Sequence, residues 1–142
     1  GAAMVADGVD AVIVASRNNL RLGASQIKLM AGGGVSSLYD QLEDVQYFED
    51  ELHAAVMAAE DAGTYVMGHV YVPEAIRRAI RAGVKSIEHG QLIDEPTKAC
   101  GCRCNPLSEK EIIIIPILYS RRNTNWWYKA PTGPISWRRN TG

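Results

Sequence analysis

The sequence lacks a long hydrophobic run and has no excess of charge of either sign. No stretch of about 18 apolar residues is present, so no membrane-spanning helix is predicted, and the start of the chain has neither the basic region nor the apolar core of a signal peptide. The formal net charge is −1, and acidic and basic residues are interspersed. This pattern excludes a basic face for nucleic acid and a polybasic patch for membranes. The expected partner is a small molecule, and a cytoplasmic location is favoured, although a fragment could have lost a targeting segment.

Cysteine is scarce and confined to a single cluster. All three cysteines lie at alternate positions from Cys100 to Cys104, an odd number too closely spaced for a disulfide framework across the chain. The sequence downstream has no Cys or His pair that would complete a set of four metal ligands. The cluster therefore predicts no metal site and does not indicate a compartment.

The length of the chain limits its possible folds. Its 142 residues suffice for one ordinary domain, whereas a complete (β/α)₈ barrel has about 250 residues. With 46% hydrophobic and 22% charged residues, the composition is that of a soluble globular protein that can build a core. A barrel interpretation therefore implies an internal fragment of a longer protein.

Residues 7–97 alternate between helical and strand periodicity at the spacing of βαβ units. Apolar residues recur at helical intervals in three segments, and short apolar strands lie between them. A glycine follows each helix, and Pro73 begins the third. Near-continuous apolar strands separated by amphipathic helices predict an α/β fold with a parallel sheet covered by helices. The predicted helices span about 8–22, 49–62 and 73–82, and the predicted strands span 25–30, 64–70 and 84–88.

The sequence changes character after Thr97. Residues 98–142 contain every Cys and every Trp, a run of four isoleucines from Ile112 to Ile115, and no helical or strand period. This segment is therefore predicted to be an irregular tail. When residues 125–142 are reverse-translated and read two bases later, the peptide has the pattern of a capped amphipathic helix. We hypothesise that the reading frame is lost between Thr97 and Asn125, which the source DNA would test.

Lys28 is anomalous because it interrupts a short apolar strand. In a buried strand, a lysine either extends past the end of the sheet to solvent or is desolvated. At a strand end beside a glycine loop, it could serve as a Schiff-base amine, a phosphate ligand or, after reaction with CO₂, a carboxylate that bridges two metal ions. The residue by itself does not distinguish these roles.

His69 and His89 end the second and third predicted strands, one helix and one strand apart. Because adjacent parallel strands present their carboxyl ends at one edge, both imidazoles are expected at the edge where α/β folds place their sites. Neutral imidazoles and a carbamate on Lys28 are suitable ligands for zinc-like ions. From spacing alone, a metal site and a pair of structural histidines have equal weight. The third histidine, His53, is predicted to be a surface residue within a helix.

The segment Gly32-Gly33-Gly34 follows the strand that contains Lys28. It could cradle a phosphate through backbone amides, but it lacks the Gly-Lys-Ser/Thr ending of a P-loop and the spacing of a dinucleotide fingerprint. The favoured interpretation is that glycine allows the backbone to turn sharply beside a ligand site.

Three motifs, in order along the chain, resemble a known enzyme family. Together they resemble the imidazolonepropionase-like branch of the amidohydrolase superfamily, especially its Xaa-Pro and Xaa-Arg/Lys dipeptidases. The resemblance covers about residues 6–97, and the tail does not share it. The motifs are Gln26-Ile27-Lys28-Leu29-Met30-Ala31-Gly32-Gly33-Gly34, His69-Val70-Tyr71-Val72-Pro73-Glu74-Ala75 and Gly83-Val84-Lys85-Ser86-Ile87-Glu88-His89-Gly90.

The resemblance implies a partial TIM (β/α)₈ barrel that runs from about helix 3 through strand 6. It also implies that Lys28 is carboxylated and bridges two divalent metal ions, with zinc the expected metal. His69 and His89 would bind the second ion, and Tyr71 would meet the carboxylate or carbonyl of the substrate. The implied reaction is hydrolysis of an amide C–N bond in a dipeptide-like substrate by a metal-bridging hydroxide.

Two parts of the family's site have no counterpart in this sequence. They are the His-x-His motif of the first strand and the last-strand aspartate that moves the proton. The complete protein is therefore expected to be an enzyme, whereas the 142-residue chain alone is expected to be inactive. A cyclic amidohydrolase or deaminase of the same superfamily is one alternative, and a non-catalytic βα module that binds a phosphate ligand is an alternative of another class. A homo-oligomeric complete protein is an open expectation.

Overall fold

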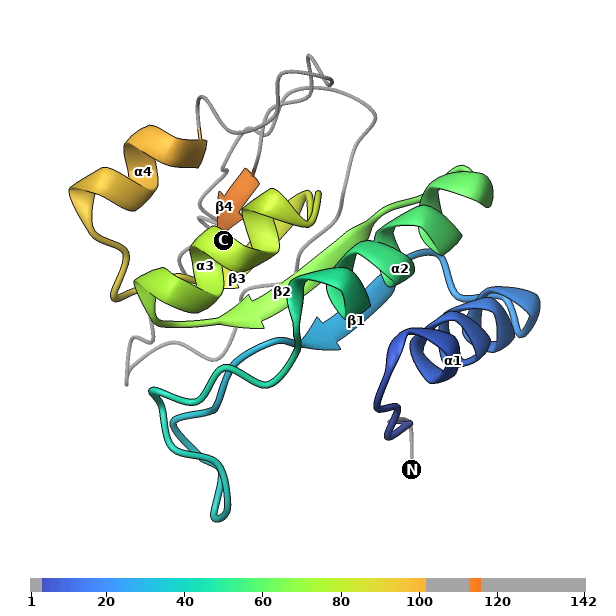
Figure 1. Cartoon of the computed structure of the whole chain (residues 1–142), viewed down its shortest axis with the longest axis horizontal. Coiled ribbons are helices and arrows are strands. Elements are labelled where there is room, and N and C mark those ends of the chain that lie inside the picture. Colours follow the sequence, from blue (N-terminus) through green and yellow to red (C-terminus); the bar gives the residue numbers. More distant parts are fainter. Residues whose placement is uncertain (1–3, 102–112, 116–142) are drawn as a thin grey trace, which may run out of the picture.

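Helices and strands alternate along the chain in the computed structural model, which describes residues 4–101 and 113–115 (Figure 1). The six elements predicted between residues 8 and 88 are confirmed, with ends that shift by at most two residues. Among the described helices, none combines the length and apolar character needed to cross a membrane. The elements are α1 (Val9–Arg21), β1 (Ile27–Met30), α2 (Glu49–Asp61), β2 (Val66–Val70), α3 (Pro73–Arg81), β3 (Ser86–His89), α4 (Glu95–Gly101) and β4 (Ile113–Ile115).

The four described strands form one parallel sheet in the order β1-β2-β3-β4. Met30 pairs with His69, His69 pairs with Glu88, and Val70 pairs with His89. Because the strand order follows the chain order, each connection crosses to the adjacent strand, as in α/β folds built from βαβ units. The carboxyl ends of β1, β2 and β3 therefore lie next to one another.

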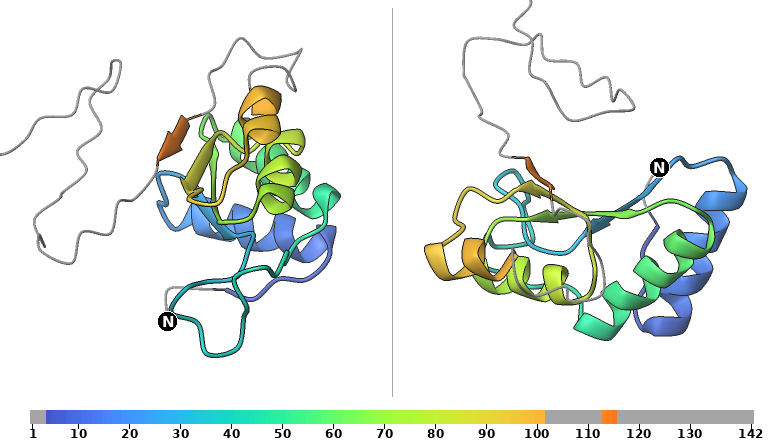
Figure 2. Two further views of the ribbon diagram at one scale, coloured as in Figure 1. Left: turned by 90° about the vertical axis from the view of Figure 1, so that its left-hand side faces the viewer. Right: turned by 90° about the horizontal axis from the view of Figure 1, so that it is seen from above.

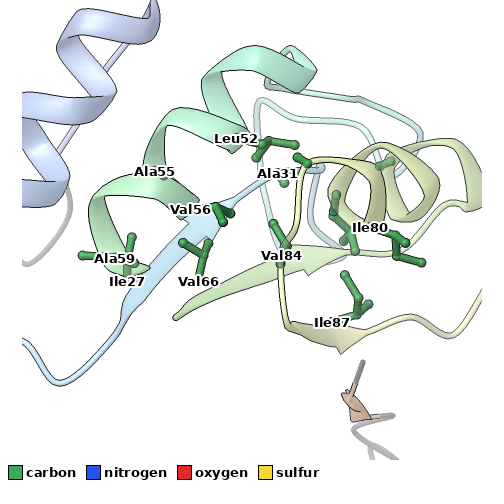
Figure 3. Close-up of a cluster of buried hydrophobic side chains, with 14 of the residues drawn as sticks. Ile27, Ala31, Leu52, Ala55, Val56, Ala59, Val66, Ile80, Val84 and Ile87 are labelled. Atoms are coloured by element: carbon green, nitrogen blue, oxygen red, sulfur yellow. The ribbon is translucent and has the colours of Figure 1, made fainter. Parts of the chain in front are cut away.

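The helices pack on one face of this sheet, which Figure 2 shows from above with the helical layer on a single side. Strand alternation places Lys28, Met67, His69 and Glu88 on the opposite face. One face of the sheet is thus apolar and covered by helices, and the other is largely polar. The buried core on the helical side, shown in part in Figure 3, includes Ile27, Val66, Val70 and Ile87 from the strands, Leu52, Ala55, Val56 and Ala59 from α2, and Ile76, Ala79 and Ile80 from α3.

Glycine ends the first three helices at positions where the chain turns with a positive φ. Gly23, Gly63 and Gly83 have φ values of 94°, 72° and 93°, a conformation that a side chain makes unfavourable. Pro73 is the first residue of α3 because the first turn of a helix has no partner for an amide hydrogen there. Short-range signals therefore set the bounds of these helices.

Glu51 connects the segment before α1 to the start of α2. Its carboxylate accepts a hydrogen bond from the backbone N–H of Gly8 at 2.6 Å and another from the backbone N–H of Phe48 at 2.7 Å. The second bond caps α2, and only 8% of the Glu51 surface is exposed. The carboxylate therefore satisfies two backbone donors that would otherwise lose their partner away from bulk water.

We expect Glu51→Ala in the complete protein to lower the free energy of unfolding by about 2 kcal/mol or more, because it leaves two partly buried N–H groups unpaired. Thermal or denaturant unfolding measures the loss. Glu60→Ala is the matched control on the same helix, since Glu60 forms only an exposed ion pair with Lys85 at 3.6 Å, worth less than about 1 kcal/mol. Equal losses in the two variants would contradict this role of Glu51.

The strand β4 corrects the expectation of a wholly irregular tail. Ile113–Ile115 pairs in parallel with β3, with Ser86 opposite Ile113 and Glu88 opposite Ile115. The isoleucine run lacks alternation, but a continuous run of β-branched residues is itself a strand signal when a neighbouring strand is available for pairing. Most of the cysteine cluster and all the tryptophans lie outside the described residues, and the loss of reading frame stays a prediction.

Candidate active site

The residues that the sequence singled out lie at the carboxyl ends of β1, β2 and β3. Lys28 lies within β1, opposite Met67 of β2, and His69 lies one residue before the end of β2. His89 is the last residue of β3, opposite Val70. This is the edge at which α/β folds place their binding sites.

Lys28 approaches Glu88 on the polar face of the sheet. Its Nζ lies 3.8 Å from Oε2 of Glu88, and 39% of its side-chain surface is accessible. Burial lowers the pKa of Lys28, and the negative charge of Glu88 partly opposes that change. The lysine is therefore neither extended fully into solvent nor enclosed, and its environment favours the uncharged amine more than water does.

Glu88 is a site residue that the sequence reasoning missed. It lies in β3, is only 8% exposed, and accepts a hydrogen bond from Oγ of Ser86 at 2.7 Å in addition to its pairing with Lys28. A glutamate inside a buried apolar strand raises the same question as a lysine there, because a buried charge requires a partner. That signal was present in the sequence.

His69 is buried and is held by the glycine loop. It is 9% exposed, and its Nε2 lies 3.0 Å from the backbone carbonyl oxygen of Gly33. Burial lowers the pKa of His69, the Gly33 carbonyl raises it, and the charge of Lys28 lowers it further. The net direction favours the neutral imidazole, which is the form that binds a metal ion.

His89 adopts a backbone conformation that redirects its side chain. Its φ of 76° lies in the left-handed region, where only this non-glycine residue is found within the described ranges 4–101 and 113–115. Regular alternation after Glu88 would point residue 89 toward the helices, yet the ring of His89 lies 4.5 Å from that of His69, centroid to centroid. Strained backbone of this kind, which costs about 1–3 kcal/mol, is concentrated at functional sites.

Tyr71 completes a cluster of three rings. Its centroid lies 5.1 Å from that of His69 in an edge contact and 4.8 Å from that of His89 in a stacked contact. Burial, His69 and Lys28 all lower the pKa of His89. The structure therefore brings together Tyr71 and both histidines, with Lys28 close enough to influence the titration of each imidazole.

The loop between β1 and α2 leaves the sheet beyond the carboxyl ends of β1 and β2 (Figure 1). Gly32 forms an antiparallel bridge with Val45, and the N–H of Gly33 donates to the carbonyl of Asp44 at 3.1 Å. A β-carbon on Gly33 would collide with the carbonyl oxygen of Gln41. The glycines thus permit a close backbone approach beside the site, and the Gly33 amide is already used within the loop.

His53 lies apart from this cluster. It is exposed on α2, as predicted, and its Nδ1 lies 3.2 Å from the carbonyl oxygen of Ala82. It also lines a shallow hollow of about 290 Å³ between α1 and α2, whose walls include Ile13 and Met57. We assign no chemistry to this hollow because it lies on the helical layer, away from the carboxyl edge.

The donor set at the edge fits a divalent metal ion in part. Among the described residues, no group of three or more His, Cys, Asp and Glu side chains is arranged to hold a metal ion. His69 and His89 would offer two neutral imidazoles, and an unmodified Lys28 amine is a poor third ligand. A carboxylated Lys28 would supply the oxygen ligand that such a site needs.

The sequence matches the Amidohydrolase family over residues 1–120, and the chain belongs to that family. This match extends beyond the residues 6–97 on which the sequence resemblance rested. The ochratoxinase of Aspergillus niger is 41% identical over 95 residues, which are 67% of this chain and 20% of that enzyme. The chain thus spans about a fifth of the length of the curated relatives it matches.

Solved structures point to the same group of hydrolases. A prolidase complexed with N-methylphosphonate-L-proline is 53% identical, with a TM-score of 0.65 over 67% of this chain and 23% of that one. A Xaa-Pro dipeptidase with methionine bound in its active site is 33% identical, with a TM-score of 0.71 over 79% and 26% of the two chains. The crystal structure of A. niger ochratoxinase is 36% identical, with a TM-score of 0.71 over 82% and 25%.

Proposed function

We propose that the complete protein is a metal-dependent hydrolase of amide C–N bonds whose substrates are dipeptide-like. The observation that carries this proposal is the cluster of His69, His89 and Tyr71 beside Lys28 at the carboxyl edge of a parallel sheet. Membership of the amidohydrolase family supports the hydrolytic reaction. The similarity to a prolidase and to a Xaa-Pro dipeptidase supports the substrate class.

The described sheet is proposed to be part of a (β/α)₈ barrel, with β1, β2 and β3 as its fourth, fifth and sixth strands. The polar face with Lys28, His69 and Glu88 would then line the interior, and the helices would form part of the outer ring. The first-strand His-x-His and the last-strand aspartate would come from residues outside the 142-residue sequence. This proposal accounts for a sheet whose second face has no helical layer in the described residues.

Lys28, His69 and His89 are proposed to hold divalent metal, with zinc the expected ion. The uncharged Lys28 amine would attack CO₂, form an N–C bond and release one proton, which yields the bridging carboxylate. When bound, the metal ions would polarise the amide carbonyl and activate water for attack. Tyr71, which packs against both imidazoles, is proposed to bind the carboxylate or carbonyl of the substrate through its hydroxyl group.

Metal removal tests the proposed function. We expect the purified complete protein to contain about two divalent ions per chain and to hydrolyse dipeptides such as Xaa-Pro. Dialysis against a chelator should lower kcat/KM by about 100-fold or more, and added zinc should restore it; a mock dialysis is the control. Elemental analysis and dipeptide turnover are the measurements. A complete protein that binds no metal and keeps its turnover after chelation would contradict the proposal.

Two alternatives are separated by the same preparation. Turnover of cyclic amides, aminated rings or a substrate of ochratoxinase, with no dipeptide hydrolysis, would favour another amidohydrolase activity; the A. niger ochratoxinase relative makes this the second candidate. A phosphate-binding module would bind inorganic phosphate and show no turnover. The structure gives that module less support, because the Gly33 amide donates to Asp44 within the loop.

A further inference from the structure

The contact between His69 and the glycine loop has a defined polarity. A backbone carbonyl can only accept a hydrogen bond, so Nε2 of His69 must carry the proton when it bonds to the Gly33 oxygen at 3.0 Å. In a neutral imidazole, the proton on Nε2 leaves the lone pair on Nδ1. The contact therefore selects one of the two tautomers of this histidine.

The carbonyl of Gly33 is held in place by the rest of its loop. The Gly33 N–H donates to Asp44 at 3.1 Å, and the N–H of Gln46 donates to Ala31 at 3.3 Å, so the two arms of the loop are hydrogen-bonded to each other. The N–H of Gln41 also donates to the side chain of Asp44 at 2.8 Å. We call this arrangement, residues 31–46, the loop clasp.

The ring of His69 has little freedom to escape this contact. The ring of His89 lies against it at an interplanar angle of 79°, and the ring of Tyr71 lies against it at 85°. His69 itself is 9% exposed. Rotation of the ring about its bond to the main-chain side would have to displace both neighbours, so the carbonyl and the two rings together hold a single orientation.

We propose that the Gly33 carbonyl, held by the loop clasp, is the positioning group of His69 and leaves Nδ1 as the nitrogen that binds metal. This assigns a role to the glycine loop, because only a residue without a β-carbon allows the chain at Gly33 to pass the carbonyl of Gln41. The assignment rests on the proposed metal-dependent function for its consequence, but the tautomer itself does not require metal.

The tautomer is tested directly in the metal-free complete protein. Labelling of histidine with ¹⁵N and observation of the imidazole nitrogens should show His69 protonated on Nε2 at a pH where it is neutral. Protonation on Nδ1, or an equal mixture of tautomers, would overturn the positioning role even if the protein is a hydrolase. Failure of the proposed function would instead show as absent metal and absent turnover with this tautomer intact.

Amide substitutions at His69 test which nitrogen is the ligand. The side-chain amide of His69→Asn lies near the place of Nδ1, whereas that of His69→Gln reaches the place of Nε2. We expect His69→Asn to retain metal affinity at least 10-fold higher than that of His69→Gln, measured by titration of the complete metal-free protein with zinc. The reverse order, or equal affinity, would contradict the assignment of Nδ1.

Alanine at neighbouring glycines tests the loop clasp. Gly33→Ala must displace the loop, and we expect a 10–100-fold loss of zinc affinity together with a mixture of His69 tautomers. Gly34→Ala is the matched control, because its β-carbon would lie 3.7 Å from Nε2 of His69, an ordinary contact, and should change neither measurement. A Gly33→Ala protein that keeps both the tautomer and the affinity of the wild type would overturn the proposal; if that variant does not fold, the two His69 variants decide it.

Discussion

Replacement of Lys28 by alanine in the complete protein is expected to lower kcat/KM for amide hydrolysis by about 100-fold or more, equivalent to about 2.7 kcal/mol of transition-state stabilisation. The physical reason is the loss of the proposed bridging carboxylate, without which two like-charged metal ions lack the ligand that joins them. Steady-state kinetics and elemental analysis measure the effect, and metal content should fall along with turnover.

Two comparisons separate this role from a structural one. Lys85→Ala is the matched control, because Lys85 precedes β3 at the opposite end of the sheet and pairs with Glu60 at 3.6 Å. It should leave turnover and metal content unchanged. Bicarbonate with a short carboxylic acid should restore part of the activity of Lys28→Ala, since a free carboxylate can take the place of the carbamate. Normal metal content and normal turnover in Lys28→Ala would rule out the bridging role.

The 142-residue chain expressed by itself is expected to show no measurable dipeptide hydrolysis, with or without zinc, and no stable monomer. Within the described part of the sheet, β1 is an edge strand, which leaves its outer hydrogen-bonding groups available to other chains. Exposed apolar side chains add to this, among them Met30 on the polar face and Leu38, Tyr39 and Phe48 in the loop that follows. A larger barrel would pair this edge.

Size-exclusion chromatography and a circular dichroism melt test that expectation. The chain should elute as oligomers or aggregates and lose its signal without a cooperative transition, whereas the complete protein under the same conditions should melt cooperatively. A monodisperse monomer with a sharp melt would contradict the expectation of instability. Metal-dependent hydrolysis by the purified 142-residue chain would contradict the expectation that its site is incomplete.

Most of the fold could be predicted because its signals are local. The helix bounds follow from Gly23, Gly63 and Gly83, whose positive φ values are unfavourable for other residues, and from Pro73 at the start of α3. The strand β4 was missed because Ile113–Ile115 has no alternation of its own, and a pairing with β3 is decided by a neighbour far away in the sequence.

The site was predicted less completely than the fold. Strand-end positions were enough to predict that His69 and His89 share one edge, because parallel strands align their carboxyl ends. Two contacts were outside the reach of that reasoning. The pairing of Lys28 with Glu88 depends on strand alternation and register, and the bond from His69 to Gly33 joins residues 36 positions apart.

The sequence by itself determined the order of helices and strands, the parallel sheet and the family, because periodicity, helix-ending residues and motifs are properties of short segments. Only the tertiary structure decided how the site residues face one another. The left-handed φ of His89 turns its ring onto that of His69, and the folded loop places the carbonyl of Gly33 against the other side of the same imidazole. Such contacts arise when separate segments pack together, since no local pattern specifies where a distant backbone carbonyl will lie.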